Sequence, residues 1–358
     1  MIAAVVALLG AGAVMIFSTT ARGDGPLVSQ TFVRQMIYVA IGIACACFLA
    51  RTDYRRLIQA NRFILAIAVV FLILVLIPGV GTFVNGARRW LRIGPVGFQP
   101  SEFAKLACLI FLAAFLGERY DSVRSFRKSF LPVLAIVGVT SALILAEPDI
   151  GTTALLCAVT WIVLFVAGAR LTFLLAPVPL VVPLAIVLAQ KDYVWRRLSA
   201  WIDPWQDPSG TGYHIIQSMI AVGSGGTWGR GMGASTQKLY FLPEASSDFI
   251  FAVLAEEQGL VGATVVICLY AAFVWAGIAI ARRAADPQGR LLAVGITTMI
   301  GLQAFINIAV VTKVLPTKGI PLPFISVGGS AAVFLLMGVG LLYSVARYSN
   351  PTPDEDYG

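Results

Sequence analysis

Hydrophobic residues dominate the chain in long runs that are separated by short polar segments. A helix that crosses a membrane needs about 20 mostly apolar residues. The pattern predicts ten membrane-spanning helices, in residues 1–18, 32–50, 63–79, 102–117, 131–146, 151–168, 172–189, 259–281, 291–312 and 327–346. The first run lacks a basic segment before it and a small-residue cleavage site, which favours a retained span over a removed signal peptide.

Composition indicates that these runs belong to a membrane protein. Apolar residues make up 58% of the chain and charged residues only 12%, with a mean hydropathy of +0.86, whereas a soluble globular domain carries about 25% charged residues. We therefore predict an all-α polytopic membrane protein with a single transmembrane domain over residues 1–346. The polar end, residues 347–358, is expected to be a loose cytoplasmic tail.

Basic residues gather in three short loops that fall on one side of a ten-span arrangement. Short cytoplasmic loops of membrane proteins are enriched in Lys and Arg. That side is therefore predicted to be cytoplasmic, with both termini on it. The residues are Arg51, Arg55, Arg56 and Arg62 after the second span, Arg119, Arg124, Arg127 and Lys128 after the fourth, and Arg282, Arg283 and Arg290 after the eighth.

The opposite, extracytoplasmic side carries a connection that is too long for a plain loop. Residues 190–248 join the seventh and eighth spans, and loops of this length usually carry structure or function. A weakly amphipathic stretch, YHIIQSMIAV, lies there between glycine-rich segments. This is typical of a re-entrant or interfacial helix held between flexible joints. The glycines do not match the GxxxxGK[ST] pattern of a nucleotide-binding loop.

Positive charge is also frequent on the extracytoplasmic side, against the rule that orients the chain. Guanidinium and ammonium groups both suit phosphate, so this distribution and the formal charge of +8 predict a ligand that bears phosphate. Interfacial anchoring and local ion pairs would account for about half of the set. Its members are Arg88, Arg89, Arg92, Arg196, Arg197, Arg230, Lys238, Lys313 and Lys318.

The reactive side chains leave acid–base chemistry to carboxylates or to a lysine. His214 is the single histidine and the five cysteines lie in apolar runs, so neither a metal cluster nor a Ser-His-Asp or Cys-His catalytic group is expected. We expect His214 to face the surface or lipid headgroups. No dedicated metal ligands are predicted, although a divalent cation (Mg²⁺ or Mn²⁺) could share phosphate charge.

The stretch FLPEASSDFIFAVLAEEQG, residues 241–259, concentrates four carboxylates in an apolar region. Asp248 immediately precedes an apolar helix, where it could be an N-terminal cap, a general base, or both. The residues alone leave these alternatives open. Glu244 lies in the preceding turn. It either reaches the same cleft as Asp248 or only stabilises the structure of the loop.

Glu256 and Glu257 lie eight and nine residues beyond Asp248, about 12 Å along a helix. On a straight helix they point about 80° and 180° away from it, so they form no close carboxylate pair with Asp248. Either they are paired inside the helix bundle, or the helix breaks near Gln258-Gly259.

Two further clusters place charge near the start of a predicted span. In QPSEFAK, Glu102 and Lys105 have the i, i+3 spacing of a local ion pair, yet charge inside a span is a functional hypothesis by default. In EPDIGTT, Glu147 and Asp149 separate the fifth and sixth spans, where they either cap and pack helices or contribute to a substrate site.

These motifs, in this order, resemble the SEDS family of cell-wall proteins (shape, elongation, division and sporulation). The resemblance runs from about residue 80 to 345. QKLYFLPE is closer to the division members, the FtsW type, and EPDIG to the elongation members, the RodA type. The matching segments are GARRWLRIGPVGFQPSEFAK, EPDIGTTALL, WRRLSAWIDPWQDPSGTGYHIIQSMIAVGSGG, GRGMGASTQKLYFLPEASSDFIFAVLAEEQGLVG and LPTKGIPLPFISVGGS.

The resemblance implies a ten-span glycosyltransferase of the bacterial inner membrane that polymerises lipid II into peptidoglycan. It implies a class B penicillin-binding transpeptidase and other division or elongation proteins as partners, and no nucleic acid. Asp248 falls on the family's essential aspartate. Two departures, Ser246-Ser247 before the aspartate and Val327 in PFISVGGS, are expected to alter the cleft without removing the carboxylate. Further motif positions are occupied by Arg88, Lys105, Glu244 and Lys318.

The implied chemistry suits the available side chains. Lipid II carries a polyprenyl pyrophosphate leaving group, so an inverting displacement needs one base for the acceptor hydroxyl and no carboxylate nucleophile. Asp248 is the predicted base, on the extracytoplasmic side, with Glu244 as its helper. The predicted substrate-binding residues are Arg88, Glu102, Lys105, Asp149, Arg196, Arg197, Lys238 and Lys318.

Two other functions fit parts of the pattern. A flippase for lipid II would also have charged residues within spans and broken helices, but it needs polar residues along a path to both faces, and here they cluster on one side. A non-catalytic scaffold of the cell-wall synthesis machinery would leave Asp248 replaceable.

Overall fold

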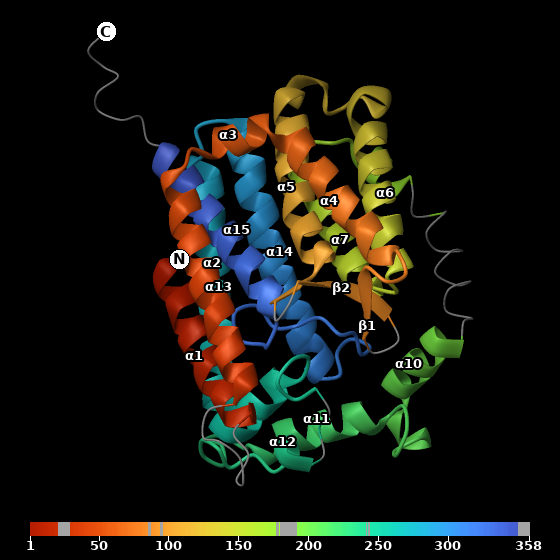
Figure 1. The fold of residues 1–358 in the computed structure, drawn as a ribbon, viewed down its shortest axis with the longest axis vertical. Coiled ribbons are helices and arrows are strands. Elements are labelled where there is room, and N and C mark those ends of the chain that lie inside the picture. Colours follow the sequence, from red (N-terminus) through yellow and green to blue (C-terminus); the bar gives the residue numbers. More distant parts are fainter. Residues whose placement is uncertain are drawn as a thin grey trace. The chain divides into compact units, whose positions relative to one another are not determined.

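The computed structural model describes residues 1–20, 29–84, 87–93, 96–176, 179, 192–240, 242 and 244–349, and it is mainly helical there (Figure 1). The chain divides into two compact units. Unit 1 comprises Met1–Ile37, Leu175–Phe273 and Gly301–Gly328, and unit 2 comprises Tyr38–Leu174, Val274–Ile300 and Gly329–Gly358.

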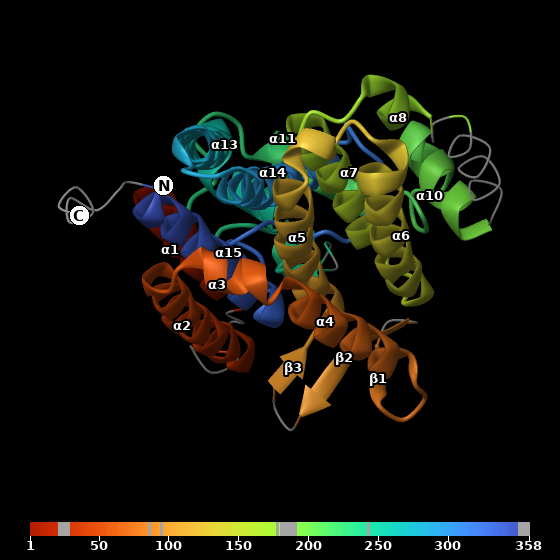
Figure 2. The same ribbon diagram turned by 90° about the horizontal axis from the view of Figure 1, so that it is seen from above.

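Unit 2 is built around α5 (Pro100–Glu118), a helix that is buried along almost its whole length. A helix that is apolar on all sides belongs in the interior of a bundle. Figure 2 shows α4, α6 and α7 beside it. The helices packed on α5 are α3 (Tyr54–Gln59), α4 (Asn61–Leu76), α6 (Leu131–Ala146), α7 (Ile150–Val166) and α15 (Gly329–Tyr348).

Short elements complete unit 2. A 3-10 turn and a π-helical turn lie between α5 and α6, and a short helix follows α7. Their bounds are Tyr120–Ser122, Phe126–Phe130 and, for α8, Leu171–Leu175.

A small antiparallel sheet lies in unit 2, next to the end of α4. Its strands are β1 (Gly81–Val84), β2 (Ala87–Ile93) and β3 (Val96–Phe98), in the order β1-β2-β3. Thr82 pairs with Trp90, and Arg92 pairs with Gly97. The prediction of an all-α chain missed this sheet. The available signal is the dipeptide Asn85-Gly86, which favours a hairpin and falls between β1 and β2.

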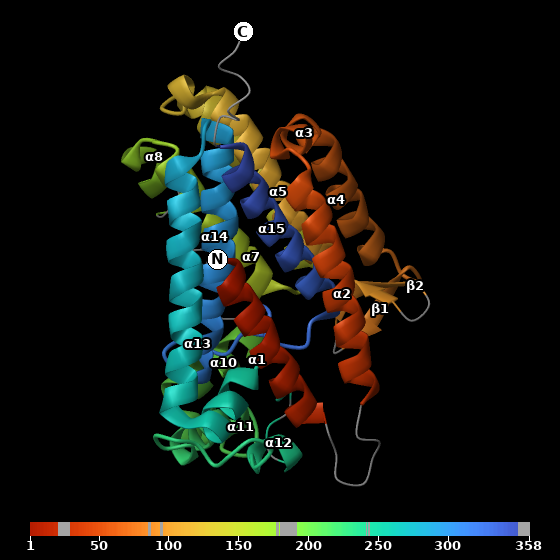
Figure 3. The same cartoon turned by 90° about the vertical axis from the view of Figure 1, so that its left-hand side faces the viewer.

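Unit 1 contains the long segment before α13. That segment, predicted to hold interfacial helices, contains α10 (Asp192–Ile202), a 3-10 turn (Pro204–Gln206), α11 (Tyr213–Ser224) and α12 (Gln237–Tyr240). α1 (Ile2–Thr20) also belongs to unit 1. The helices α2 (Gln30–Arg51), α13 (Ile250–Arg283) and α14 (Pro287–Val311) each begin in one unit and end in the other, and α13 and α14 run side by side (Figure 3).

The described helices coincide with nine of the ten predicted spans. Seven of them are long and apolar enough to cross a membrane, and α4 and α7 are shorter apolar helices. The predicted span 172–189 lies mostly outside the described residues, so the total of ten stays a prediction, as does the orientation of the chain. The polytopic helical fold itself is confirmed.

The helix α13 is interrupted at Gly259, where φ is 66° and ψ is −165°. The glycine-rich loop after α11 replaces the helical hydrogen bonds that this break removes. Its amides donate to two carbonyls before the break, and its carbonyls accept from two amides after it. The pairs are Arg230 N to Glu256 O (3.0 Å), Gly231 N to Glu257 O (3.0 Å), Leu260 N to Gly226 O (2.9 Å) and Val261 N to Thr227 O (3.2 Å).

Two glycines make this close approach of backbones feasible. A Cβ atom on Gly259 would lie 2.3 Å from the amide nitrogen of Gly229, and one on Gly229 would lie 2.2 Å from the carbonyl oxygen of Glu257. Both glycines also have positive φ angles, of 66° and 82°, which other residues rarely adopt. The predicted break near Gln258-Gly259 is thereby confirmed.

Candidate functional site

Asp248 lies in a turn that leads into α13. The carbonyl of Glu244 accepts hydrogen bonds from the amides of Ser247 and Phe249, which closes the turn. The helix begins at Ile250, and the carbonyl of Phe249 accepts the first helical hydrogen bonds. Phe249 therefore directly precedes the helix, and Asp248 lies one residue before it, so a helix cap and a general base both stay predictions for Asp248.

Three successive backbone carbonyls fix the segment that carries Asp248. Each accepts a hydrogen bond from a different donor on α14 or on the loop between α14 and α15. This geometry holds the backbone on both sides of the aspartate without using its carboxylate. The bonds are Val327 N to Ser246 O (2.9 Å), Ser326 Oγ to Ser247 O (2.6 Å) and Asn307 Nδ2 to Asp248 O (2.9 Å).

Two amide side chains on α14 hold the loop at residues 318–324, and one of them also holds the segment that carries Asp248. Asn307 Nδ2 donates to the carbonyl of Ile320 (2.8 Å) as well as to that of Asp248. One turn earlier, Gln303 Nε2 donates to the carbonyl of Pro321 (2.9 Å). Both amides are buried, so these bonds are shielded from competing water.

Gly319 provides the surface against which the carboxylate of Asp248 rests. A Cβ atom at position 319 would lie only 2.9 Å from Asp248 Oδ2. The constraint is one of space, and any larger residue would have to push the carboxylate aside. The carboxylate therefore lies against the backbone next to Lys318.

Two basic side chains, those of Lys318 and Arg197, lie close together at this loop. Burial lowers the pKa of the half-buried Lys318, and the neighbouring positive charge of Arg197 lowers it further. Arg197 Nη1 donates to the carbonyl of Thr317 (3.4 Å), and α10 is tied to the same loop by Trp201 Nε1, which donates to the carbonyl of Lys313 (3.0 Å). An anion bound at Lys318 would relieve this unfavourable electrostatic situation.

Glu244 and Arg196 are both exposed residues of the same unit. Glu244 adopts a left-handed backbone conformation with φ of 57°, and its Oε2 accepts a hydrogen bond from Ser247 Oγ (2.8 Å). The exposed guanidinium of Arg196 is on α10, beside Arg197 in sequence. Glu244 is thus attached to the turn that carries Asp248.

His214 belongs to this site, although the sequence suggested only a surface role. Its ring stacks on that of Phe249, with centroids 5.9 Å apart and planes at 8°. Burial lowers its pKa, the charge of Arg197 lowers it further, and the charge of Glu244 opposes the shift. Its Nδ1 is buried and has no hydrogen-bond partner in the described part of the chain. The signal missed was its place in YHIIQSMIAV, one of the segments that carries the resemblance.

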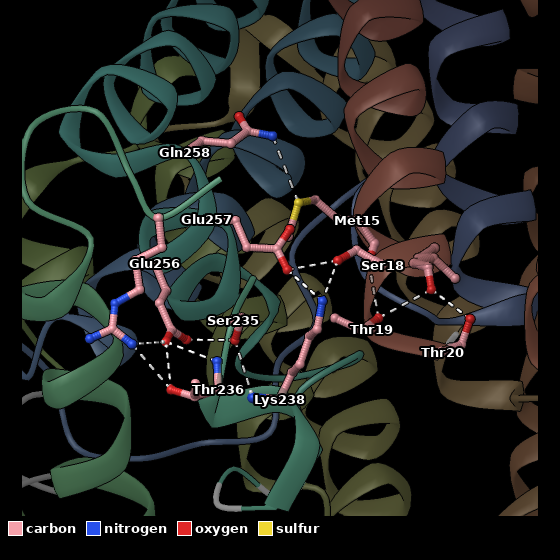
Figure 4. A network of polar contacts seen from close by, with 12 residues as sticks. Met15, Ser18, Thr19, Thr20, Ser235, Thr236, Lys238, Glu256, Glu257 and Gln258 are labelled. Carbon is pink, nitrogen blue, oxygen red and sulfur yellow. Dashed lines mark hydrogen bonds and ion pairs between the residues drawn. The ribbon is translucent and has the colours of Figure 1, made fainter. Parts of the chain in front are cut away.

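Lys238 lies elsewhere in unit 1, in a closed polar contact with Glu257 (Figure 4). Lys238 Nζ is 2.7 Å from Glu257 Oε1 and 2.7 Å from Ser18 Oγ. Ser18 Oγ itself donates to Glu257 Oε1 (2.7 Å). Both charged side chains are almost completely buried. Lys238 was predicted to bind substrate, but in the structure its ammonium forms an ion pair with Glu257.

Glu256 is the centre of a second buried contact, also shown in Figure 4. It accepts hydrogen bonds from Ser235 Oγ (2.5 Å), from the amide of Thr236 (3.1 Å) and from Arg230 Nη1 (3.3 Å). These contacts confirm that the two glutamates are paired inside the bundle. They anchor residues 230–238 to the part of α13 just before the break at Gly259.

In unit 2, Glu102 and Lys105 form the ion pair that their spacing predicted. Lys105 Nζ is 2.8 Å from Glu102 Oε1, and both side chains are almost fully buried in the first turns of α5. Burying two charges is costly unless they are paired. The pair therefore places a polar site inside an otherwise apolar helix bundle.

Asp149, Glu147 and Arg89 form a second polar site in unit 2. Asp149 caps α7, accepting from the amide (3.0 Å) and the Oγ1 (2.8 Å) of Thr152, which is the structural one of its two alternatives; its part in substrate binding stays a prediction. Arg89, on β2, donates to the carbonyls of Glu147 (2.9 Å) and Pro148 (2.6 Å). Burial, and then the charge of Asp149, raise the pKa of Glu147 to about 8. Its carboxyl oxygens have no hydrogen-bond partner among the described residues.

The predicted site residues thus fall in both units. Unit 1 brings Asp248, Glu244, Arg197 and Lys318 to one region, carries Arg196 on α10, and holds Lys238 in a separate ion pair. Unit 2 holds the remaining predicted residues, with Arg88 on β2 opposite Phe83. Those residues of unit 2 are Arg88, Glu102, Lys105 and Asp149.

The fold and these buried polar sites define a polytopic helical membrane protein with a carboxylate fixed at the start of a broken helix among basic side chains. The chain belongs to the family of cell cycle proteins that comprises FtsW, RodA and SpoVE, whose family model matches residues 1–351. The resemblance noted in the sequence is thereby confirmed.

Similar proteins cover nearly the whole chain. Stage V sporulation protein E of Bacillus subtilis is 42% identical over 347 residues, which are 96% of this chain and 94% of that protein. A probable peptidoglycan glycosyltransferase FtsW of Geobacter metallireducens is 40% identical over 352 residues, covering 97% and 94% of the two chains.

Solved structures agree with this family. A chain in a structure titled as the structural coordination of polymerization and crosslinking by a peptidoglycan synthase complex matches with a TM-score of 0.79 and 30% identity, over 97% of this chain and 98% of that one. The rod shape determining protein RodA of Thermus thermophilus matches with a TM-score of 0.71 and 27% identity, over 98% and 97%.

Proposed function

We propose that the protein is a peptidoglycan glycosyltransferase that polymerises lipid II into glycan strands. The observation that carries this proposal is the fixed position of Asp248, whose backbone is held by three carbonyl contacts and whose carboxylate lies against Gly319, next to Lys318. The relatives named as peptidoglycan glycosyltransferases support the reaction class.

In the proposed reaction, the carboxylate of Asp248 removes the proton from the 4-hydroxyl of the acceptor sugar. The resulting oxygen nucleophile attacks the anomeric carbon of the donor, and the bond to polyprenyl pyrophosphate breaks with inversion. The pyrophosphate leaves with the electron pair of that bond. Glu244, attached to the same turn through Ser247, assists by positioning. No second carboxylate nucleophile is required.

Basic side chains bind the pyrophosphate in this proposal. Lys318 and Arg197 are the ligands in unit 1, because a half-buried ammonium beside a guanidinium gains most from a bound anion. Arg196, Arg88 and Lys105 complete the predicted set. Glu102, Lys105, Asp149 and Lys238 have structural partners in the fold, so we rank these four below the others as substrate ligands.

A divalent cation, Mg²⁺ or Mn²⁺, is proposed to share the charge of the pyrophosphate. The described residues contain no group of three His, Cys, Asp or Glu side chains that could hold a metal ion. The cation would therefore be bound mainly through phosphate oxygens, as Mg²⁺ often is.

The proposed setting follows from the sequence and the relatives. The protein acts in the inner membrane of a bacterium, with its site on the extracytoplasmic side and both termini in the cytoplasm. Its proposed partners are the nascent glycan strand, a class B penicillin-binding transpeptidase and other proteins of division or elongation. The similarity to a chain of a peptidoglycan synthase complex supports the transpeptidase partner.

The test uses the purified full-length protein in detergent with labelled lipid II. Detergent removes the membrane that a flippase would have to cross, so polymer can arise only by catalysis. We expect Asp248→Asn to lower the rate about 10²- to 10⁴-fold, the usual contribution of a general base, with lipid II binding retained. Glu118→Gln, at an exposed carboxylate, is the matched control. Full activity of Asp248→Asn would refute the base, whereas no polymer from the parent protein would refute the glycosyltransferase.

A further inference from the structure

An apolar groove of about 740 Å³ lies in unit 2 between α4, α5 and α6. Its volume is within the range of small-molecule sites. Apart from Arg62 and Thr140 the lining is aliphatic and aromatic, and two of its residues, Val70 and Val139, are more than half exposed. The groove is therefore accessible from the lipid that would surround this face. It is separate from the residues to which we assign catalysis.

An apolar lining cannot by itself select a ligand in a membrane. The surrounding lipid chains are as apolar as the side chains of the groove, so transferring a chain between them yields little free energy. Any preference for one lipid must come from polar groups at the ends of the groove.

One end of the groove is cationic. Arg62, near the start of α4, is a lining residue with an exposed side chain. Phe115, near the end of α5, is another lining residue, and the guanidinium carbon of Arg119 lies 4.2 Å from the centroid of its ring. The start of α4 and the end of α5 lie at the same end of the unit (Figure 1).

Arg119 has hydrogen-bonding capacity that the described part of the chain does not use. Its Nη1 is buried without a hydrogen-bond partner there, and the nearest carboxylate oxygen, Glu118 Oε2, is 3.6 Å away, which is too long for a hydrogen bond. A buried donor without an acceptor is costly. A phosphate oxygen at the end of the groove would supply the acceptor.

We propose that this groove binds an acyl chain of an anionic phospholipid, whose headgroup phosphate is held by Arg62 and Arg119. The basic loops predict that this end faces the cytoplasm, so the lipid would come from the cytoplasmic leaflet. Aliphatic residues hold the chain, and the two arginines provide the selection for negative charge.

Native mass spectrometry of the delipidated full-length protein tests this site. Phosphatidylglycerol and phosphatidylcholine with the same acyl chains are added in turn, and the ratio of bound lipid is measured. We expect Arg62→Gln and Arg119→Gln each to lower the ratio about fivefold, because a basic residue near the headgroups contributes about 1 kcal/mol. Arg124→Gln, with the same loss of charge in a loop outside the groove, should leave the ratio unchanged.

A second pair of variants tests the groove itself. Ala135→Phe introduces a ring among the lining residues and should remove the bound phosphatidylglycerol. Leu134→Phe, at a neighbouring exposed position that does not line the groove, should not. The proposal would be overturned if the parent protein retained phosphatidylglycerol and phosphatidylcholine equally. It would also be overturned if Arg124→Gln lowered the ratio as much as Arg62→Gln and Arg119→Gln do. Tighter retention of a polyprenyl phosphate than of phosphatidylglycerol would overturn the assigned occupant. Unfolding temperatures confirm that each variant is folded.

Discussion

A substitution at Lys238 can distinguish a structural role of this residue from a role in substrate binding. Replacement by methionine keeps the length of the side chain and removes its charge. Glu257 would then remain fully buried, and of its two hydrogen-bonding partners, Lys238 and Ser18, only Ser18 would be left. The other carboxylate oxygen, Oε2, already lacks a partner among the described residues. Removing one partner of a buried ion pair costs about 3–5 kcal/mol. We expect Lys238→Met to lose about that much stability.

A double-mutant cycle provides the control for this prediction. Lys238→Met with Glu257→Gln removes both charges, and replacement of a complete buried pair by neutral groups is often nearly neutral. The double variant should therefore regain most of the lost stability, which thermal unfolding in detergent measures for all four proteins. If Lys238→Met unfolds like the parent but no longer polymerises lipid II, the structural interpretation is wrong and Lys238 is a substrate ligand.

Three further perturbations test the surroundings of the two polar regions. Gly319→Ala should lower kcat about 10²-fold by displacing the carboxylate of Asp248, with little change in KM, whereas Gly223→Ala, where a Cβ meets nothing within 4 Å, should be silent. Because the pKa of Lys318 is lowered, its ammonium loses its charge at a lower pH than an ordinary lysine does. As pH is raised, KM for lipid II should therefore increase before the usual titration range of lysine is reached. Lys318→Arg, which stays charged, should abolish that increase. Glu147 has a pKa raised to about 8 from 4.5, so its stabilising contribution is complete below pH 4.5 and is lost as pH rises through 8. Glu147→Gln should flatten that fall in unfolding temperature, and an unchanged pH profile would show that Glu147 does not titrate in this range.

Much of the fold could be predicted because the hydrophobic runs are long and clearly bounded. Run length predicts a spanning helix without knowledge of its neighbours, and the described helices follow it closely. The sheet at residues 81–98 was missed because its strands are short and its pairing depends on a hairpin turn. The spacing of Glu102 and Lys105 was sufficient to predict their ion pair, because both residues belong to one helix.

Contacts between distant segments could not be predicted in the same way. Nothing near Asp248 in sequence indicates that Asn307 holds its carbonyl or that Gly319 supports its carboxylate. The stacking of His214 on Phe249 likewise depends on how α11 packs against the turn before α13. Helical geometry did separate Glu256 and Glu257 from Asp248, but their partners come from α1 and from residues 230–238.

The join between the glycine-rich loop and the broken helix α13 is made by backbone atoms. Its four hydrogen bonds and the contact between Gly229 and Gly259 do not depend on the side chains that the loop carries. Trp228 and Met232 point outward, with 80% and 72% of their surface exposed. These two positions can therefore change in the course of evolution, for example to suit a different neighbour, without disturbing the join. Replacement of either glycine would instead push the two backbones apart, because a Cβ atom has no room there.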